Sequence, residues 1–270
     1  MIRRFLFFIL TFYVTCLAQL HAVQAADLPQ PDELVVAILP TYPPFTQLDI
    51  TGQPAGMFID VWRLWAKKTG QRITFTTKDW VGTLEALKSG EADIHSGLFY
   101  SEKRDRWMDY SQAFYVNSSS FYRRIDGPTP PSGSSLRGMK IGVIKGYLQE
   151  TFLKEAYSNA IVIPLVDDLE LIKALAAGRV DLILSEDPTI ENLLTQTGMQ
   201  GRIGSVGAPV MTNDLYASVL DGRDRLLEKI NAGFEQITPR EWAEIESRWI
   251  KDPSKRFFEG SVKRAVELTA

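Results

Sequence analysis

The chain has 270 residues, of which 30 are basic and 33 acidic, so its formal charge at neutral pH is −3. A mildly acidic chain lacks the excess of Lys and Arg that nucleic acid or anionic lipid requires, and this argues against both as partners. The length suits one large domain or two of ordinary size, and a hydrophobic content of 45% is enough for a sizeable core.

The N-terminus has the features of a secretory signal peptide. Arg3 and Arg4 precede a largely apolar run over residues 5–18, and small residues follow at Val23-Gln-Ala25. The run is too short for a membrane span, so we expect residues 1–25 to be a cleaved signal peptide and the mature protein to be exported.

Cleavage after Ala25 changes both charge and cysteine content. It removes two arginines, which moves the formal charge to −3 − 2 = −5, and it removes Cys16, the only cysteine. The mature protein should therefore contain no disulfide. A lipoprotein site at Cys16 is the alternative, but Tyr13-Val-Thr15 matches such a site poorly.

Two segments resemble each other at an offset of 172 − 84 = 88 residues: Leu84–Ile94 and Ile172–Leu182. Each predicts a helix that ends at a glycine, followed by a short strand entered through an Asp. A strand precedes each copy, over residues 34–39 and 140–144. The pattern predicts two α/β lobes built on one plan.

The segments around this repeat predict how the lobes are joined. Residues 114–124 are strand-like, residues 127–135 form an exposed loop by composition, and residues 216–220 predict a return strand. Helices should follow at 224–237 and, through a capping box, from Thr238. Two strands would then cross between lobes as a hinge. The expected division is lobe 1 over 26–118, lobe 2 over 119–213, and lobe 1 again over 214–270.

Ligands of open α/β sheets bind beyond the carboxyl ends of the strands. Four loops of this sequence follow the carboxyl ends of predicted strands. Their candidate ligand-contacting side chains are Tyr42, Phe45, Phe99, Ser101, Arg104, Tyr147, Gln149, Glu186 and Asp187.

Arg104 and Glu186 could form two charged poles for a ligand. We expect Ser101 to cap a helix whose first turn carries Arg104, which would place a guanidinium beside free amides suited to a carboxylate. Glu186 follows an apolar strand and could receive an ammonium across the cleft. The alternatives are a solvated surface Arg within residues 102–106 and an acid that merely stabilises a helix N-terminus.

Aromatic residues in these loops have two possible roles. Tyr42 and Phe45 could wall an apolar pocket, or they could pack in the core, and Trp80 at the start of the first repeat helix has the same ambiguity. His95 has no second His or Cys partner, so we expect a hydrogen-bonded structural His, no metal site and no cofactor.

With these loops identified, the chain resembles the family 3 extracellular solute-binding proteins, the periplasmic polar amino acid binders, from Leu34 to about Trp249. The resemblance implies a type II, Venus flytrap α/β fold. The motifs that carry it are Thr41-Tyr-Pro-Pro-Phe45; Gly56-Met-Phe-Ile-Asp60; Gly90-Glu-Ala-Asp93 with Gly97-Leu-Phe-Tyr-Ser101-Glu-Lys-Arg104; Asp109-Tyr-Ser111; Leu136-Arg-Gly138-Met-Lys-Ile-Gly142; and Gly178-Arg-Val-Asp181.

The resemblance implies roles for single residues. Arg104 matches the arginine that binds a ligand α-carboxylate, Glu186 the acid that takes the α-ammonium, Tyr42 an aromatic that stacks on the ligand side chain, and Trp80 a pocket wall. Gly97, Ser101 and Tyr147 fall in the same ligand-binding loops.

Four residues depart from the family pattern. Glu186 is one methylene longer than the usual Asp. Phe99 stands where many members have a hydroxyl, Leu148 where a Thr often contacts the carboxylate, and Leu39 where binders of cationic amino acids have an acid. The pocket implied is more apolar and aromatic.

The sequence also resembles the periplasmic sensor domains of diguanylate cyclases and histidine kinases, through residues 60–70 and 92–99. The tail over 265–270 would suit a connection to a further module. We therefore expect a monomeric periplasmic binding protein whose partner is a membrane permease for ABC-type uptake or, alternatively, a membrane-bound signalling protein. An enzyme like the periplasmic dehydratases that share the fold is the remote alternative, and Glu186 is its one candidate acid.

Overall fold

The computed structural model describes residues 32–129, 136–253 and 256–258. Within these ranges, none of the helices has the length and apolar character needed to cross a bilayer. The expected signal peptide, its cleavage site, Cys16 and the tail over 265–270 lie outside the described residues, as does most of the 127–135 loop.

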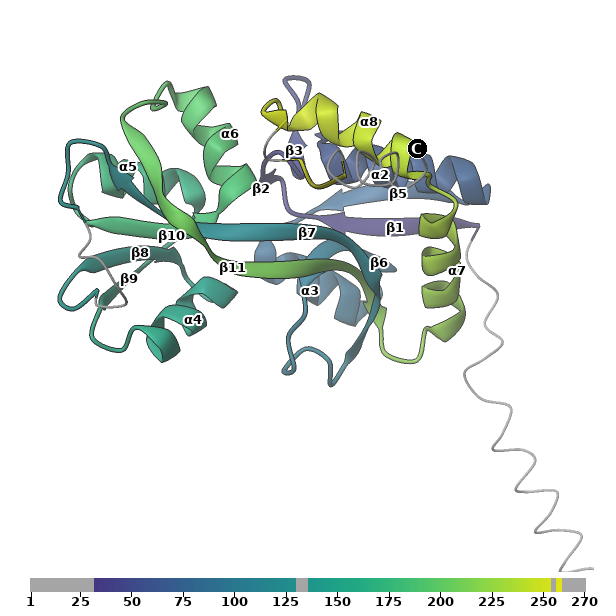
Figure 1. Ribbon diagram of the computed structural model, residues 1–270. Coiled ribbons are helices and arrows are strands. Elements are labelled where there is room, and N and C mark those ends of the chain that lie inside the picture. Colours follow the sequence, from purple (N-terminus) through teal and green to yellow (C-terminus); the bar gives the residue numbers. More distant parts are fainter. Residues whose placement is uncertain (1–31, 130–135, 254–255, 259–270) are drawn as a thin grey trace, which may run out of the picture.

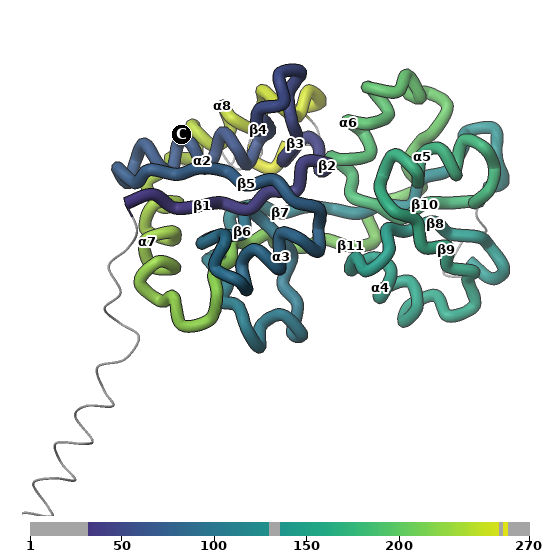
Figure 2. The backbone as a smooth tube through the Cα atoms, turned by 180° about the vertical axis from the view of Figure 1, so that it is seen from behind, coloured from purple at the N-terminus to yellow at the C-terminus, as the bar shows by residue number. Residues whose placement is uncertain are grey.

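The protein has two lobes that share one eight-stranded sheet (Figures 1 and 2). The strand order is β5-β1-β6-β11-β7-β10-β8-β9, so the long strands β7 and β11 lie at the centre and run through both lobes. The bounds are β1 Glu33–Ile38, β5 Arg72–Thr77, β6 Ile94–Phe99, β7 Met108–Arg124, β8 Lys140–Ile144, β9 Ile161–Leu165, β10 Leu182–Glu186 and β11 Ile203–Leu220.

The two lobes repeat one topology. In lobe 1, β1 pairs in parallel with β5 and β6, and β11 lies antiparallel beside β6. In lobe 2, β8 pairs in parallel with β9 and β10, and β7 lies antiparallel beside β10. This arrangement confirms the predicted two-lobed α/β fold, while the exact lobe boundaries at 118/119 and 213/214 stay predictions.

The repeat detected at an offset of 88 residues corresponds to helices α3 (Trp80–Ser89) and α5 (Asp168–Ala176). Each helix is followed by a glycine in the left-handed region, Gly90 with φ 76° and Gly178 with φ 68°. A side chain is strained in that conformation, which is why glycine ends both copies.

Each repeat then enters its strand through an Asp with the same role. Oδ2 of Asp93 accepts a hydrogen bond from the backbone N–H of Val35 at 2.9 Å, and Oδ2 of Asp181 accepts one from Lys140 at 2.8 Å. The carboxylate thus links β6 to the start of β1 in lobe 1, and β10 to the start of β8 in lobe 2. These paired contacts explain why the motif occurs twice.

Helices cover both faces of the sheet in each lobe (Figure 1). In lobe 1, Trp65 donates from Nε1 to the Ile230 carbonyl at 3.0 Å, which joins α2 to α7. A Cβ added to Gly233 would lie 2.1 Å from that indole nitrogen, so close packing requires glycine there. The remaining bounds are α2 Met57–Thr69, α4 Leu148–Ala156, α6 Asp187–Thr197, α7 Asp224–Glu235, α8 Pro239–Trp249, and the small sheet of β2 Thr41–Tyr42, β3 Thr46–Leu48 and β4 Pro54–Ala55.

The two crossing strands differ in regularity. Val206 pairs with Phe121, and the next pair is Met211 with Ser119. Residues 207–210 of β11 therefore lie opposite a single residue of β7. The ladder is continuous where the strands pass between lobes, from Met211 to Asp214, and it is interrupted inside lobe 2, where β7 is also paired with β10.

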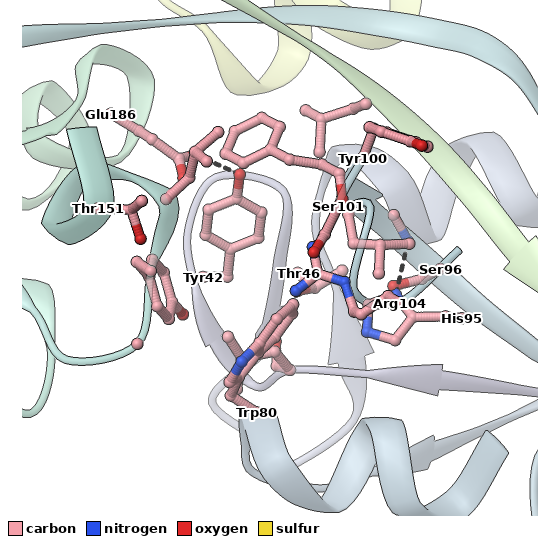
Figure 3. A pocket seen from close by; sticks show the side chains of 18 residues that line it. Tyr42, Thr46, Trp80, His95, Ser96, Tyr100, Ser101, Arg104, Thr151 and Glu186 are labelled. Carbon is pink, nitrogen blue, oxygen red and sulfur yellow. Dashed lines mark hydrogen bonds between the residues drawn. The ribbon is translucent and has the colours of Figure 1, made fainter. Parts of the chain in front are cut away.

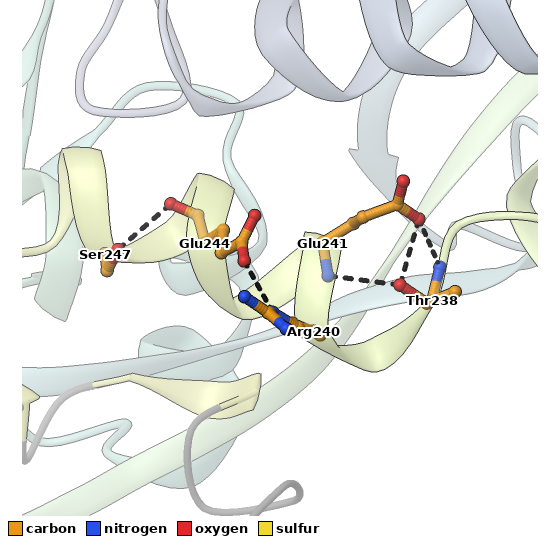
Figure 4. A network of polar contacts seen from close by, with 5 residues as sticks. All are labelled: Thr238, Arg240, Glu241, Glu244 and Ser247. Atoms are coloured by element: carbon orange, nitrogen blue, oxygen red, sulfur yellow. Dashed lines mark hydrogen bonds and ion pairs between the residues drawn. The ribbon is translucent and has the colours of Figure 1, made fainter.

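Helix α8 begins with the predicted capping box (Figure 4). The Thr238 hydroxyl accepts from the Glu241 backbone N–H at 3.3 Å, and the Glu241 carboxylate accepts from the Thr238 backbone N–H at 2.9 Å. Pro239 follows at the first helical position. The box fixes the start of a helix that buries Trp242 and Ile245 against lobe 1.

Replacing the cap should weaken this helix. Thr238→Ala removes the hydroxyl that satisfies the Glu241 amide, and we expect a loss of about 1 kcal/mol in the free energy of unfolding. Urea denaturation followed by circular dichroism measures the loss. Thr238→Ser keeps the hydroxyl and should retain most of the stability, so an equal loss in both variants would contradict the capping role.

Candidate functional site

A cavity of about 140 Å³ lies between the lobes and is lined from both (Figure 3). Nine of the ten predicted site residues line it, and Phe45 does not. The lining residues are Leu39, Tyr42, Thr46, Trp80, His95, Ser96, Gly97, Leu98, Phe99, Tyr100, Ser101, Arg104, Gly146, Tyr147, Leu148, Thr151, Glu186 and Leu215.

Phe45 belongs to the core of lobe 1 rather than to the cavity. Its side chain is fully buried, with ring centroids 4.8 Å from Tyr42 and 4.8 Å from Phe58. The backbone N–H of Phe45 donates to the Tyr42 carbonyl at 2.9 Å in a tight turn. This turn directs Tyr42 to the cavity and Phe45 inward, so the prediction of Phe45 as a ligand contact is wrong.

Arg104 presents a half-buried guanidinium to the cavity, and one of its donors has no partner in the part of the chain that the structure describes. Its Nη2 donates to the Phe99 carbonyl at 2.7 Å, and its Cζ lies 5.4 Å from the centroid of the Trp80 ring. Its Nε is buried and has no hydrogen-bond partner among the described residues. An unpaired buried donor is costly, and an anion that accepted from it would remove that cost.

The backbone around Arg104 differs from the prediction. Residues 101–107 form successive turns, with Arg104 N–H and Asp105 N–H both donating to the Ser101 carbonyl at 2.9 Å, and no α-helix forms. The reason is distance along the chain, since β7 already begins at Met108. The expected helix N-terminus is therefore wrong, and attraction for a carboxylate rests on the guanidinium itself.

Glu186 lies opposite, on lobe 2, at the end of β10. It is 4% exposed, and its Oε2 accepts from the Tyr42 hydroxyl and from Nδ2 of Asn117. Figure 3 shows the Tyr42 hydroxyl directed toward Glu186, while Arg104 lies on the side formed by His95, Ser96 and Trp80. Glu186 thus faces lobe 1, as predicted, and hydrogen bonds connect the lobes at this acid.

Burial controls the charge of Glu186. Desolvation raises the pKa of its carboxyl from the ordinary value of 4.5 to about 8, and nearby Asp168 adds to the rise. Hydrogen bonds from Tyr42, Gln149 and Asn117 oppose it. The carboxyl therefore holds its proton at neutral pH until a positive charge lies beside it.

His95 lines the cavity, and its imidazole is neutral. It is 2% exposed, its Nε2 lies 3.2 Å from Thr83 Oγ1, and its Nδ1 accepts from the Gly97 backbone N–H at 3.3 Å. Burial, and then the charge of Arg104, lower the pKa of His95 to about 3. Across the described residues, no group of three His, Cys, Asp or Glu side chains is placed to hold a metal ion.

Aromatic rings from both lobes meet at the cavity. Trp80, the first residue of α3, lies 5.6 Å from the ring of Tyr147, which precedes α4. A Cβ added to Gly97 would lie 2.8 Å from the Phe58 ring, so this glycine allows β6 to pack closely on the core. Phe99, Ser101 and Leu148 complete the predicted lining.

Sequence reasoning missed Asn117, which reaches both Tyr42 and Glu186. It lies in a stretch of β7 that looks like an ordinary strand, and nothing in its neighbours indicates a contact with an acid 69 positions away. Sequence reasoning also did not name Leu98 and Tyr100, although they lie within the quoted motif from Gly97 to Arg104. The other lining residues that it did not name are Thr46, Ser96, Gly146, Thr151 and Leu215.

Two α/β lobes of one topology, joined by two crossing strands around a cleft with a cation on one side and an acid on the other, define a Venus flytrap binding domain. The bacterial extracellular solute-binding proteins, family 3, match residues 34–252, and the chain belongs to this family.

Similar proteins include binding proteins and sensors. The lysine/arginine/ornithine-binding periplasmic protein of Escherichia coli K12 is 28% identical over 160 residues, 58% of this chain and 62% of that protein. The virulence sensor protein BvgS of Bordetella pertussis is 24% identical over 216 residues, 79% of this chain and 17% of BvgS. The match thus spans less than two thirds of either relative. The solved periplasmic VFT2 domain of BvgS shares the fold, with a TM-score of 0.73 at 23% identity over 81% of this chain and 93% of that domain.

The protonated state of Glu186 predicts a pH-dependent stability. Between pH 4.5 and 8 the folded protein keeps a proton that the unfolded chain has lost, so Glu186 lowers stability as pH rises, by at most about 1.4 kcal/mol per pH unit. The Glu186→Gln variant has no titratable group at this position. Its free energy of unfolding, measured with urea, should therefore increase relative to that of the wild type from pH 5 to pH 8.

Two controls support this comparison. Burial also raises the pKa of Asp168, to about 6, but Asp168 is present in both proteins and its contribution cancels. Glu155→Gln, at an exposed position of α4, controls for removing one acid. A stability difference between Glu186→Gln and wild type that stays constant with pH would show that Glu186 is ionised throughout.

Proposed function

We propose that the protein captures a small ligand that carries a carboxylate, and most specifically an amino acid, in the cleft between its lobes. The observation that carries this proposal is the half-buried guanidinium of Arg104 at the cavity, whose buried Nε has no hydrogen-bond partner among the described residues. A ligand carboxylate supplies the missing acceptor and the balancing negative charge.

The second pole supports an amino acid. Glu186 is a buried acid with a raised pKa, so an ammonium placed beside it would lower that pKa and form a charge-assisted hydrogen bond. A zwitterion satisfies both poles at once. Relatives named for binding lysine, arginine and ornithine agree with this class of ligand.

Binding would favour closure of the cleft. Arg104, Tyr42 and Trp80 belong to lobe 1, whereas Glu186 and Tyr147 belong to lobe 2. A ligand that bonds to both sides has its full set of contacts only when the lobes are together, so it stabilises the closed state.

The proposal includes no chemical step. A general acid needs a reacting partner, and the other titratable group deep in the cavity, His95, is neutral and hydrogen-bonded within lobe 1. Formation of a product from a prephenate-like or arogenate-like substrate would contradict this part of the proposal.

We place the protein in the periplasm and propose that its closed form is read by a membrane permease for ABC-type uptake. The similarity to BvgS favours the alternative, a sensing role beside a membrane-bound kinase. Loss of labelled-ligand uptake in a deletion strain supports transport, and intact uptake with a lost transcriptional response supports sensing.

Arg104→Ala should abolish ligand binding while leaving the fold intact. Wild-type protein should gain thermal stability with ligand by mass action, about 2.7 kcal/mol at 100 times the Kd, and Arg104→Ala should gain none. Differential scanning fluorimetry against amino acids, dicarboxylates and aromatic acids measures both. Arg106→Ala, an exposed neighbour on the same turn, is the matched control and should behave as wild type. A variant at position 104 that keeps its affinity would show that the site is misplaced.

Glu186→Gln should weaken amino acids far more than simple carboxylates, because only the former place an ammonium beside it. With wild-type protein, amino acid affinity should also rise with pH up to about 8, by at most about tenfold per unit, since ionising Glu186 costs less there. Isothermal titration calorimetry at pH 6, 7 and 8 checks both points. An equal loss of affinity for amino acids and for simple carboxylates would contradict the proposal that Glu186 binds the ligand ammonium.

A further inference from the structure

The cavity offers no third charged group beyond its two poles. Of its lining residues, only Arg104 and Glu186 carry side chains that a zwitterion's carboxylate and ammonium would pair with. His95 is the remaining titratable base in the lining, and burial with Arg104 nearby keeps it neutral. The tyrosines of the lining are neutral at physiological pH, and the pKa of Tyr42 and of Tyr147 is raised further by burial.

The rest of the wall is mainly apolar and comes from five elements or loops. Leu39 follows β1, Leu98 and Phe99 end β6, and Trp80 and Leu148 begin helices on opposite lobes. Leu215 pairs with Phe99 across the sheet. A ligand side chain confined here would contact Leu39, Trp80, Leu98, Phe99, Leu148 and Leu215.

The Thr46 hydroxyl, near Leu39, already donates its hydrogen bond within the protein. Thr46 Oγ1 donates to the Leu39 carbonyl at 2.6 Å, and Thr151 is exposed at the rim. A cationic or anionic ligand side chain placed against the buried residues Leu98 and Leu215 would therefore lose its water without gaining a counter-charge, which is strongly unfavourable in proteins.

The volume sets an upper size. The cavity of about 140 Å³ is comparable to an engineered apolar cavity of about 150 Å³ that holds one benzene ring. Because Arg104 and Glu186 line this same cavity, the space must hold the carboxylate and ammonium of the ligand as well as its side chain, and it takes a single amino acid and no peptide.

We propose that the ligand is an amino acid with an uncharged, apolar side chain. This inference rests on the proposed function and makes it more specific. The proposed ligand class differs from the cationic amino acids for which the lysine/arginine/ornithine-binding relative is named.

Calorimetry on the purified chain tests the class of side chain directly. Leucine or phenylalanine should bind at least about 100-fold more tightly than lysine, arginine or glutamate, the factor expected when a buried charge lacks a partner. Tightest binding of a charged or amide side chain would overturn the inference and leave the proposed function standing. Failure of every amino acid would overturn both.

A substitution at Leu39 tests the cavity wall. Leu39→Asp places a carboxylate where the side chain would lie, and lysine or arginine affinity should rise at least about tenfold as leucine affinity falls. Leu39→Asn has the same shape without charge and should lose leucine affinity with no gain for lysine. Leu48→Asp, at an exposed position of β3, should behave as wild type.

Circular dichroism and melting curves establish that each Leu39 variant is folded. A folded Leu39→Asp protein that binds lysine no better than Leu39→Asn would overturn the assignment of this wall to the ligand side chain. If Leu39→Asp does not fold, the ligand comparison on the wild-type chain decides the inference by itself.

Discussion

The site depends on the cost of burying charge between two lobes. Arg104 is permanently charged and carries an unpaired buried donor, while Glu186 avoids the same cost by holding a proton. The two groups are therefore not a preformed ion pair. They are separate poles, and under the proposed function a zwitterionic ligand would satisfy both together and offset the cost of keeping them in the cleft.

The repeated topology places these poles. In each lobe a set of parallel strands ends at the interface, so the loops after β1 and β6 face those after β8 and β10. Leu39, the 99–104 segment, Gly146 and Glu186 meet there for that reason, although they are scattered along the chain. The hydrogen bonds of Asp93 and Asp181 hold the third strand of each lobe in register, which fixes where these loops begin.

The lobes, the repeat and half of the cavity lining, nine of its eighteen residues, could be predicted because they follow from periodicity, from strand ends and from the family motifs. Local conformation was harder: residues 101–107 contain plausible helix signals, yet β7 starts too soon for a helix to form. Phe45 was misassigned because it shares one turn with Tyr42 and its ring contacts that of Tyr42, yet only Tyr42 reaches the cavity while Phe45 is fully buried in the core of lobe 1. Asn117 gave no local signal, since its partner Glu186 is near only after the sheet forms.

The interrupted ladder lies at the lobe 2 end of the two connections between the lobes. At the crossing itself, Met211 to Asp214 of β11 pair in register with Ser119 to Val116 of β7, whereas residues 207–210 of β11 lie opposite a single residue of β7 inside lobe 2. Because backbone hydrogen bonds join the two strands at the crossing, we expect them to bend and twist as one paired ribbon when one lobe turns against the other.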